Sequence, residues 1–251
     1  MGFIGGSFGY KMLKTIAPRT KTNQIARYVS DSDLKLQQYF GDDIFDIAAN
    51  KTIIDFGCGE GNQAIEIAKQ SPTSHVIGLD IQEHHLEKGT KKAQECSVSD
   101  RCQFLTTTDE LADIIISKDA FEHFSNPSEI LDIMSRLLKP NGYVLAAFGP
   151  TWYHPYGGHL FSVFPWSHLI FTENAQILWR SDFKTDGATK FSEVDGGLNQ
   201  ITINQFEQIV LRSPFSLDFL ETIPLKGLRI LKSKFLREFG SSIVRCRLSL
   251  K

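Results

Sequence analysis

The sequence predicts an α/β fold, namely a Rossmann-like, mostly parallel seven-stranded sheet flanked by helices, with an aromatic-rich insertion after strand five. Three observations indicate this fold. Short β-prone runs alternate with segments of helical periodicity over residues 51–149. The run at 111–117 (LADIIIS) is almost entirely apolar, as expected of a central strand covered on both faces. The run at 242–250 alternates apolar and polar residues, which is typical of a strand with one buried face.

Periodicity and turn residues place the individual elements. We expect strands at 52–56, 75–80, 102–105, 111–117, 143–148, 217–222 and 242–250. We expect helices at 62–70, 82–95, 127–138, 202–213 and 225–239. Residues 140–142 (PNG) predict a turn before the fifth strand, and residues 23–49 predict helices that precede the sheet. Residues 149–199 are rich in aromatic residues, His and Gly without a clear period, which predicts an insertion over the site.

Length and composition fit one globular domain. The chain has 251 residues, of which 41% are hydrophobic and 22% charged, so it can bury a substantial core. Within one domain at 1–251 we expect N-terminal helices (1–50), a cofactor-binding core (51–149), a substrate or lid insertion (150–200) and the C-terminal part of the sheet (201–251). The net charge of -2 gives no broad electrostatic footprint for nucleic acid or anionic lipid.

Cysteine usage and the leading segment point to the cytoplasm. Cys58, Cys96, Cys102 and Cys246 are scattered, which suits reduced thiols better than a disulfide framework or a zinc site. Residues 1–20 lack the apolar core and cleavage site of a signal peptide, and no segment reaches membrane-spanning length. We therefore expect a cytoplasmic protein with no membrane span, and the oligomeric state stays open.

A glycine loop follows the first predicted strand. Gly57, Gly59 and Gly61 stand at alternate positions in DFGCGEG, where glycine allows tight turns and close approach of a ligand to the main chain. Asp80 closes the next strand, and an acid there can accept hydrogen bonds from both ribose hydroxyls. A nicotinamide dehydrogenase is the competing interpretation, but its pyrophosphate-binding loop has the pattern G-x-G-x-x-G. In addition, the negative charge of Asp55 would be unfavourable near a diphosphate.

With these motifs the chain resembles the class I S-adenosylmethionine-dependent methyltransferases. The resemblance covers about residues 50–150 and includes VIGLD ending at Asp80, IIISKDAFEH at 114–123 and LKPNGYVLAAF at 138–148. It implies S-adenosylmethionine as cofactor and S-adenosylhomocysteine as product, with the glycines at the methionine part and Asp80 at the ribose. Asp109 is the nearest match to the adenine contact, with Thr107 and Thr108 as rivals. The expected cofactor-binding residues are Asp55, Gly57, Cys58, Gly59, Gly61, Asn62, Asp80, Ile81, Thr108, Asp109, Ser117 and Lys118.

The segment after the fourth strand should lie nearest to the methyl group, according to the resemblance. Methyl transfer requires alignment, exclusion of water and sometimes removal of a proton, so Asp119 and His123 are catalytic candidates. Equally, a Glu-His pair at 122–123 can cap and pack a short helix. The D-x-x-E-H pattern is also similar to the metal-holding E-x-x-E-H of ubiquinone-pathway and small-RNA 2'-O-methyltransferases, but Asp119 has a shorter arm than Glu, and we assign no metal.

The insertion offers further candidates between residues 152 and 168. His154 and His159 flank Gly157-Gly158 and are our preferred bases, while an aromatic subcore is the alternative for each. His168 lies in a more apolar run and is expected to be structural. The span could instead contact a lipid or a partner through Phe161, Phe164, Trp166, Leu169, Ile170 and Phe171.

Together these features predict methyl transfer to oxygen or nitrogen of a small-molecule metabolite, with no nucleic-acid partner. One alternative is a larger acceptor, such as a lipid-linked sugar, a protein or RNA. The other is a cofactor-binding regulator that has lost catalysis.

Overall fold

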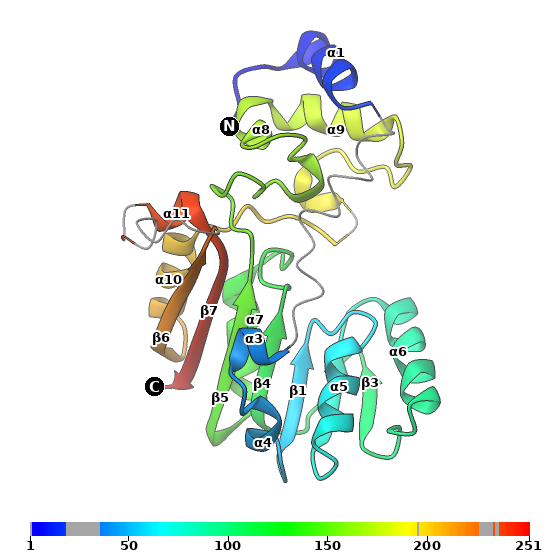
Figure 1. Cartoon of the computed structure of the whole chain (residues 1–251), viewed down its shortest axis with the longest axis vertical. Helices are drawn as coiled ribbons and strands as arrows, with labels where there is room; N and C mark the ends of the chain where they lie inside the picture. The colour runs from blue at the N-terminus through cyan, green and yellow to red at the C-terminus, as the bar shows by residue number, and fades with distance from the viewer. Residues whose placement is uncertain (1, 19–35, 195, 226–232, 234–235) are drawn as a thin grey trace.

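The computed structural model describes residues 2–18, 36–194, 196–225, 233 and 236–251. Seven strands form one sheet in the order β3-β2-β1-β4-β5-β7-β6 (Figure 1). β1 to β5 run parallel, whereas β7 is antiparallel to both β5 and β6. The strands are β1 (Thr52–Phe56), β2 (His75–Leu79), β3 (Cys102–Leu105), β4 (Ala112–Lys118), β5 (Leu138–Phe148), β6 (Phe215–Pro224) and β7 (Ser241–Leu250). The predicted Rossmann-like, mostly parallel sheet is confirmed.

Helices cover both faces of this sheet. The described helices are α1 (Gly6–Ile16), α3 (Leu36–Phe40), α4 (Ile44–Ile47), α5 (Asn62–Gln70), α6 (Glu83–Glu95), α7 (Pro127–Arg136), η1 (His159–Phe161), α8 (Ser167–Ile170), α9 (Glu173–Ser181), η2 (Phe191–Glu193), α10 (Ile203–Arg212) and α11 (Arg237–Gly240). Ile114 and Ile116 of β4 join a core with α3 to α6, whereas Ile115 joins a core with α7 and α10. This alternation explains why β4 is apolar throughout, because each face of the strand is covered.

The predicted turn at 140–142 is wrong. β5 begins at Leu138, which pairs with Ala112, and after an irregularity Tyr143 pairs with Ile114, so the PNG residues form a bulge inside the strand. Glycine suits this position, because a Cβ on Gly142 would make a tight contact of 3.0 Å with the Asp113 carbonyl oxygen. The predicted helix at 225–239 falls largely on residues 226–232 and 234–235, outside the described residues, and its described end is α11.

α1 and the segment between β5 and α10 form a unit, which we call the cap, beyond the end of the sheet where the parallel strands finish (Figure 1). α1 packs against α9, and the backbone N–H of Thr172 donates to the Ile4 carbonyl at 2.9 Å. The Trp179 indole N–H donates to the Ala17 carbonyl at 3.0 Å. Of the predicted N-terminal helices, α3 and α4 cover the sheet, whereas α1 belongs to this cap. Within the described ranges, no helix is long and apolar enough to cross a membrane.

The Phe206 ring holds α10 against the sheet, and its removal should be costly. Phe206 is fully buried, and its ring centroid lies 4.7 Å from that of Phe148 and 5.2 Å from that of Phe121. We expect Phe206→Ala to lower the free energy of unfolding by about 3–5 kcal/mol, measured by urea denaturation. Leu211→Ala on the same helix, where the side chain is 67% exposed, should change it by less than about 0.5 kcal/mol. Equal losses in the two variants would contradict this packing.

Candidate functional site

The glycine loop joins β1 to α5 in a conformation that its three glycines make possible. Gly57, Gly59 and Gly61 have φ values of 80°, 51° and 78°. A Cβ on Gly61 would lie 2.3 Å from the Phe104 ring, and one on Gly57 would lie 2.8 Å from Ala120, whereas one on Gly59 would meet nothing within 4 Å. The loop is therefore packed tightly at two glycines and open at Gly59.

Asp80 fastens this loop to the end of β2. One carboxylate oxygen accepts the Gly59 N–H at 2.9 Å, and the other accepts the Gln82 N–H at 2.9 Å. Each oxygen keeps a second lone pair, so the carboxylate can still accept hydrogen bonds from a ligand. Ile81 follows and is 90% exposed. Asn62 is exposed at the start of α5 and accepts from Lys92 at 3.1 Å.

Asp55 lies below the loop as a buried acid. Its side chain is 1% exposed, and Oδ2 has no hydrogen-bond partner. Burial raises the pKa of Asp55 to about 7, opposed by a backbone hydrogen bond from Ala64 and by the charge of Lys118. A buried, unpartnered carboxylate oxygen next to an open loop indicates a place for a hydrogen-bond donor or a cation. Burial also raises the pKa of the Cys58 thiol, so a nucleophilic role does not suit this residue.

The end of β4 presents a carboxylate backed by a buried ammonium. Lys118 has 4% of its side chain exposed and forms an ion pair with Asp119, whose side chain is 39% exposed. Asp119 has a φ of 52°, which turns the chain at the strand end. The neighbouring Ser117 is fully buried, and its hydroxyl donates to the Phe56 carbonyl at 3.0 Å. Asp119 is therefore the member of this segment that a ligand can reach.

Glu122 and His123 lie between the sheet and the cap. Glu122 is 2% exposed, one carboxylate oxygen accepts the Gly149 N–H at 3.2 Å, and Oε2 has no partner. Burial raises the pKa of Glu122 to about 7. His123 Nδ1 lies 2.8 Å from the Gly197 carbonyl oxygen, and a carbonyl can only accept, so Nδ1 carries the proton. The neutral His123 ring therefore has its lone pair on Nε2.

The three histidines of the insertion differ in protonation pattern. His154 Nδ1 accepts the Tyr156 N–H at 3.1 Å, so the neutral ring carries its proton on Nε2, which is buried without a partner. His159 has a buried Nε2 without a hydrogen-bond partner. Burial lowers the pKa of His154 to about 4 and that of His159 to about 3. His168 has both ring nitrogens hydrogen-bonded, to Ser162 and to the Trp152 carbonyl, inside the cap core.

The structure brings together some predicted residues and separates others. The His123 and His159 rings lie 5.4 Å apart, between β4 and the cap. Thr108 and Asp109 follow β3, which ends beside Asp80, since the Asp80 N–H donates to the Leu105 carbonyl at 3.4 Å. The alternative of a contact surface for a lipid or partner does not hold for Phe161 and Phe171, which are 3% and 1% exposed because they fill the cap core.

Sequence reasoning missed Phe104 and Asn199. The Phe104 ring fills the space left by Gly61, Gly78 and Gly89. The Asn199 amide donates to the carbonyls of Phe121 and Phe124, at 2.6 and 2.8 Å, and so ties the insertion to the segment after β4. A lone aromatic residue in a strand and an Asn in a loop give no sequence signal of these contacts.

No three His, Cys, Asp or Glu side chains converge as a set of metal ligands anywhere in the described ranges. Asp119 pairs with Lys118, and His123 bonds to a backbone carbonyl. The segment after β4 is thus built from ion pairs and hydrogen bonds between protein groups.

An open glycine loop followed by a strand-end acid defines a nucleoside-binding α/β protein. In the sequence comparison, residues 47–149 match the family model described as "Methyltransferase domain". The chain is 33% identical over 94 residues to a ribosomal protein L11 methyltransferase of Pasteurella multocida, covering 37% of this chain and 32% of that protein. It is 31% identical over 129 residues to a ubiquinone biosynthesis O-methyltransferase of Hydrogenovibrio crunogenus, covering 48% and 50%. The chain thus spans half or less of these relatives.

Solved structures show the same fold. A mitomycin 7-O-methyltransferase superposes with a TM-score of 0.55 at 13% identity, covering 96% of this chain and 60% of that one. A geranyl diphosphate C-methyltransferase from Streptomyces coelicolor gives a TM-score of 0.55 at 14% identity, covering 91% and 76%. The match over residues 47–149 and the shared fold confirm the resemblance to the class I S-adenosylmethionine-dependent methyltransferases that was drawn from the glycine loop.

The buried histidines should make the protein sensitive to acid. A folded-state pKa near 3 for His159, below the unfolded value of about 6.5, means that the unfolded chain binds the proton first, so stability is lost as pH falls from 6.5 toward 3. We expect His159→Gln to flatten the fall in unfolding free energy by up to about 1.4 kcal/mol per pH unit, measured by urea denaturation from pH 6.5 to 4.5. The control Leu160→Gln should keep the wild-type slope, and a variant slope equal to wild type would contradict the assignment.

Proposed function

We propose that the chain transfers a methyl group from S-adenosylmethionine to an oxygen or nitrogen of a small-molecule acceptor. The observation that carries this proposal is the glycine loop open at Gly59, bounded by the anchored carboxylate of Asp80 and by the unpartnered oxygen of buried Asp55. These groups fit a cationic nucleoside, since they offer close backbone approach, a ribose acceptor and a buried acceptor for an ammonium group.

The candidate residues would contact different parts of the cofactor. Asp80 would hold the ribose hydroxyls, and the exposed Ile81 would cover one face of the adenine, with Thr108 or Asp109 at its edge. Asp55 would receive the amino group of the methionine part. Asp119 would face the positive sulfur, because its carboxylate is the exposed partner of its ion pair. Cys58, Asn62 and Ser117 would shape the site through the backbone and through packing, since Cys58 and Ser117 are buried and Asn62 pairs with Lys92.

When bound, the cofactor supplies an electrophilic methyl group on a sulfonium. The protein then has to orient the acceptor, exclude water and take up a proton. His123 suits the last task, because the Gly197 carbonyl fixes its tautomer and leaves the Nε2 lone pair. His154 presents an N–H to its surroundings and would orient the acceptor as a donor. His159, with its lowered pKa, would stay neutral against His123 and accept a hydrogen bond.

The small-molecule acceptor is favoured over a larger one by the cap. The segment between β5 and α10 forms its own aromatic core over the strand ends, and α1 completes it, so the acceptor side is covered. One relative is named for a ribosomal protein and another for ubiquinone biosynthesis, so both acceptor classes occur among similar proteins. Turnover of S-adenosylmethionine with a metabolite extract would separate catalysis from cofactor binding alone, and product formed only with a macromolecular fraction would reverse the choice of acceptor.

Loss of the Asp80 carboxylate should weaken cofactor binding. Asp80→Ala removes the acceptor of the Gly59 and Gln82 N–H groups together with the ribose acceptor, so we expect a loss of about 1.5–3 kcal/mol in binding S-adenosylhomocysteine, measured by calorimetry. Asp132→Ala, an exposed acid on α7, is the matched control and should bind like wild type. An unchanged dissociation constant in Asp80→Ala would refute this assignment.

Removal of the His123 imidazole should lower turnover without disturbing the cofactor. We expect His123→Gln to reduce kcat by about 10²–10⁴-fold, the usual contribution of a general base, with the dissociation constant for S-adenosylhomocysteine nearly unchanged. His154→Gln should chiefly raise KM for the acceptor, because it removes an orienting donor. A kcat equal to that of wild type in His123→Gln would contradict the proposed role as a base and would indicate that His123 serves only in packing.

A further inference from the structure

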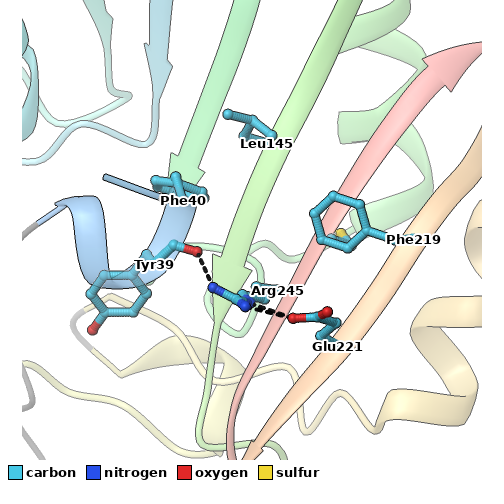
Figure 2. A pocket seen from close by; sticks show the side chains of 8 residues that line it. Tyr39, Phe40, Leu145, Phe219, Glu221 and Arg245 are labelled. Carbon is cyan, nitrogen blue, oxygen red and sulfur yellow. Dashed lines mark hydrogen bonds and ion pairs between the residues drawn. The ribbon is translucent and has the colours of Figure 1, made fainter. Parts of the chain in front are cut away.

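A hollow of about 220 Å³ opens on the sheet face beside α3, away from the glycine loop (Figure 2). Its walls are Phe40, Leu145 and Phe219, and its rim carries the Arg245 guanidinium. Two nitrogens of Arg245 donate to one Glu221 oxygen at 2.9 and 2.6 Å, and Nη1 donates to the Tyr39 carbonyl at 3.3 Å. Arg245 therefore ties the backbone of α3 to the outer strands β6 and β7.

The side chain of Tyr39 reaches the donor site from the same helix. Tyr39 is 2% exposed, and its ring centroid lies 4.6 Å from the Lys118 ammonium. An ammonium over an aromatic face is attracted most strongly when both are shielded from water, as they are here. Lys118 in turn pairs with Asp119. One residue thus contacts Arg245 through its carbonyl and Lys118 through its ring.

We propose that Tyr39 is a positioning residue for the methyl-donor site, held in place by Arg245 and Glu221. Its ring anchors the Lys118 ammonium, and the ammonium fixes the exposed Asp119 carboxylate that would face the cofactor. This inference rests on the proposed function, because Asp119 acquires its role from the bound sulfonium. The affinity for the cofactor then depends on an ion pair on another part of the sheet.

The chemistry of the two cofactor forms gives a specific signature. S-adenosylmethionine carries a positive sulfur, whereas the sulfur of S-adenosylhomocysteine is neutral. A fixed carboxylate near the sulfur favours the cationic form, because charge attraction falls as distance and solvent access increase. Greater mobility of the Asp119 side chain should therefore weaken the binding of S-adenosylmethionine more than the binding of S-adenosylhomocysteine. General loosening of α3 would weaken both to the same extent.

The neighbouring ion pair on the same two strands offers a matched control. Arg247 lies two residues along β7, pairs with Asp218 at 3.2 Å and stacks over the Tyr143 ring at 3.9 Å. Within the described part of the chain, these contacts of Arg247 are with β5 and β6, not with α3. Replacement of either arginine removes an ion pair between β6 and β7, but only Arg245 bears on Tyr39.

The test is calorimetric titration of the full chain with S-adenosylmethionine and with S-adenosylhomocysteine, alongside thermal unfolding. Tyr39→Phe keeps the aromatic face and should bind both within twofold of wild type. Tyr39→Leu should raise the Kd for S-adenosylmethionine about tenfold and that for S-adenosylhomocysteine about threefold or less. Arg245→Met should raise the Kd for S-adenosylmethionine about threefold and that for S-adenosylhomocysteine by less. Arg247→Met should bind both nucleosides like wild type, although its Tm should fall about as much as that of Arg245→Met.

Several results would overturn the inference. They are equal Kd values for Tyr39→Phe and Tyr39→Leu, equal losses for the two nucleosides, or the same loss in Arg245→Met and Arg247→Met. If Tyr39→Leu fails to fold, the two arginine variants still decide the matter. A wild-type chain that binds neither nucleoside would refute the proposed function itself, a result distinct from all of these.

Discussion

The Asp80 carboxylate is the interaction on which the donor site depends. It accepts one backbone N–H from the glycine loop and one from the start of the next segment, so it joins the ends of β1 and β2. Without it the Gly59 N–H would lose its acceptor, and only the Gly57 and Cys58 N–H groups, which donate to the Leu79 carbonyl, would still hold the described part of the loop to β2. Phe104 supports the same arrangement from below, because its ring occupies the space that side chains at Gly61 and Gly78 would need.

The fold around the glycine loop could be predicted closely from the sequence. The bounds of β1, α5 and β3 agree with those expected from periodicity, and β2 ends one residue earlier. Local rules suffice here, because a strand, a glycine loop and a helix are encoded by consecutive residues. The same holds for Asp80, whose position at a strand end follows from the length of β2 alone.

The acceptor half depended on contacts between residues far apart in the chain. Asn199 bonds to carbonyls near residue 121, and α1 packs on α9, contacts that no short window of sequence contains. The roles proposed for His123 and His154 rest on which backbone group each ring contacts, so residue type alone could not separate a candidate base from a candidate donor. The prediction of a turn at residues 140–142 failed for a related reason, because pairing with β4 overrides the local preference of Pro-Asn-Gly for a turn.

The cap affects the order in which parts of the chain can fold during synthesis. Its core needs Leu13 and Ala17 from one segment and Phe171 and Trp179 from another, more than 150 positions later. During synthesis, α1 must therefore wait for most of the polypeptide to emerge before it finds its partner. Strands β1 to β5 and their helices emerge before the second cap segment, so the proposed donor site would form before the cap is complete, whereas β6 and β7 join the sheet after it.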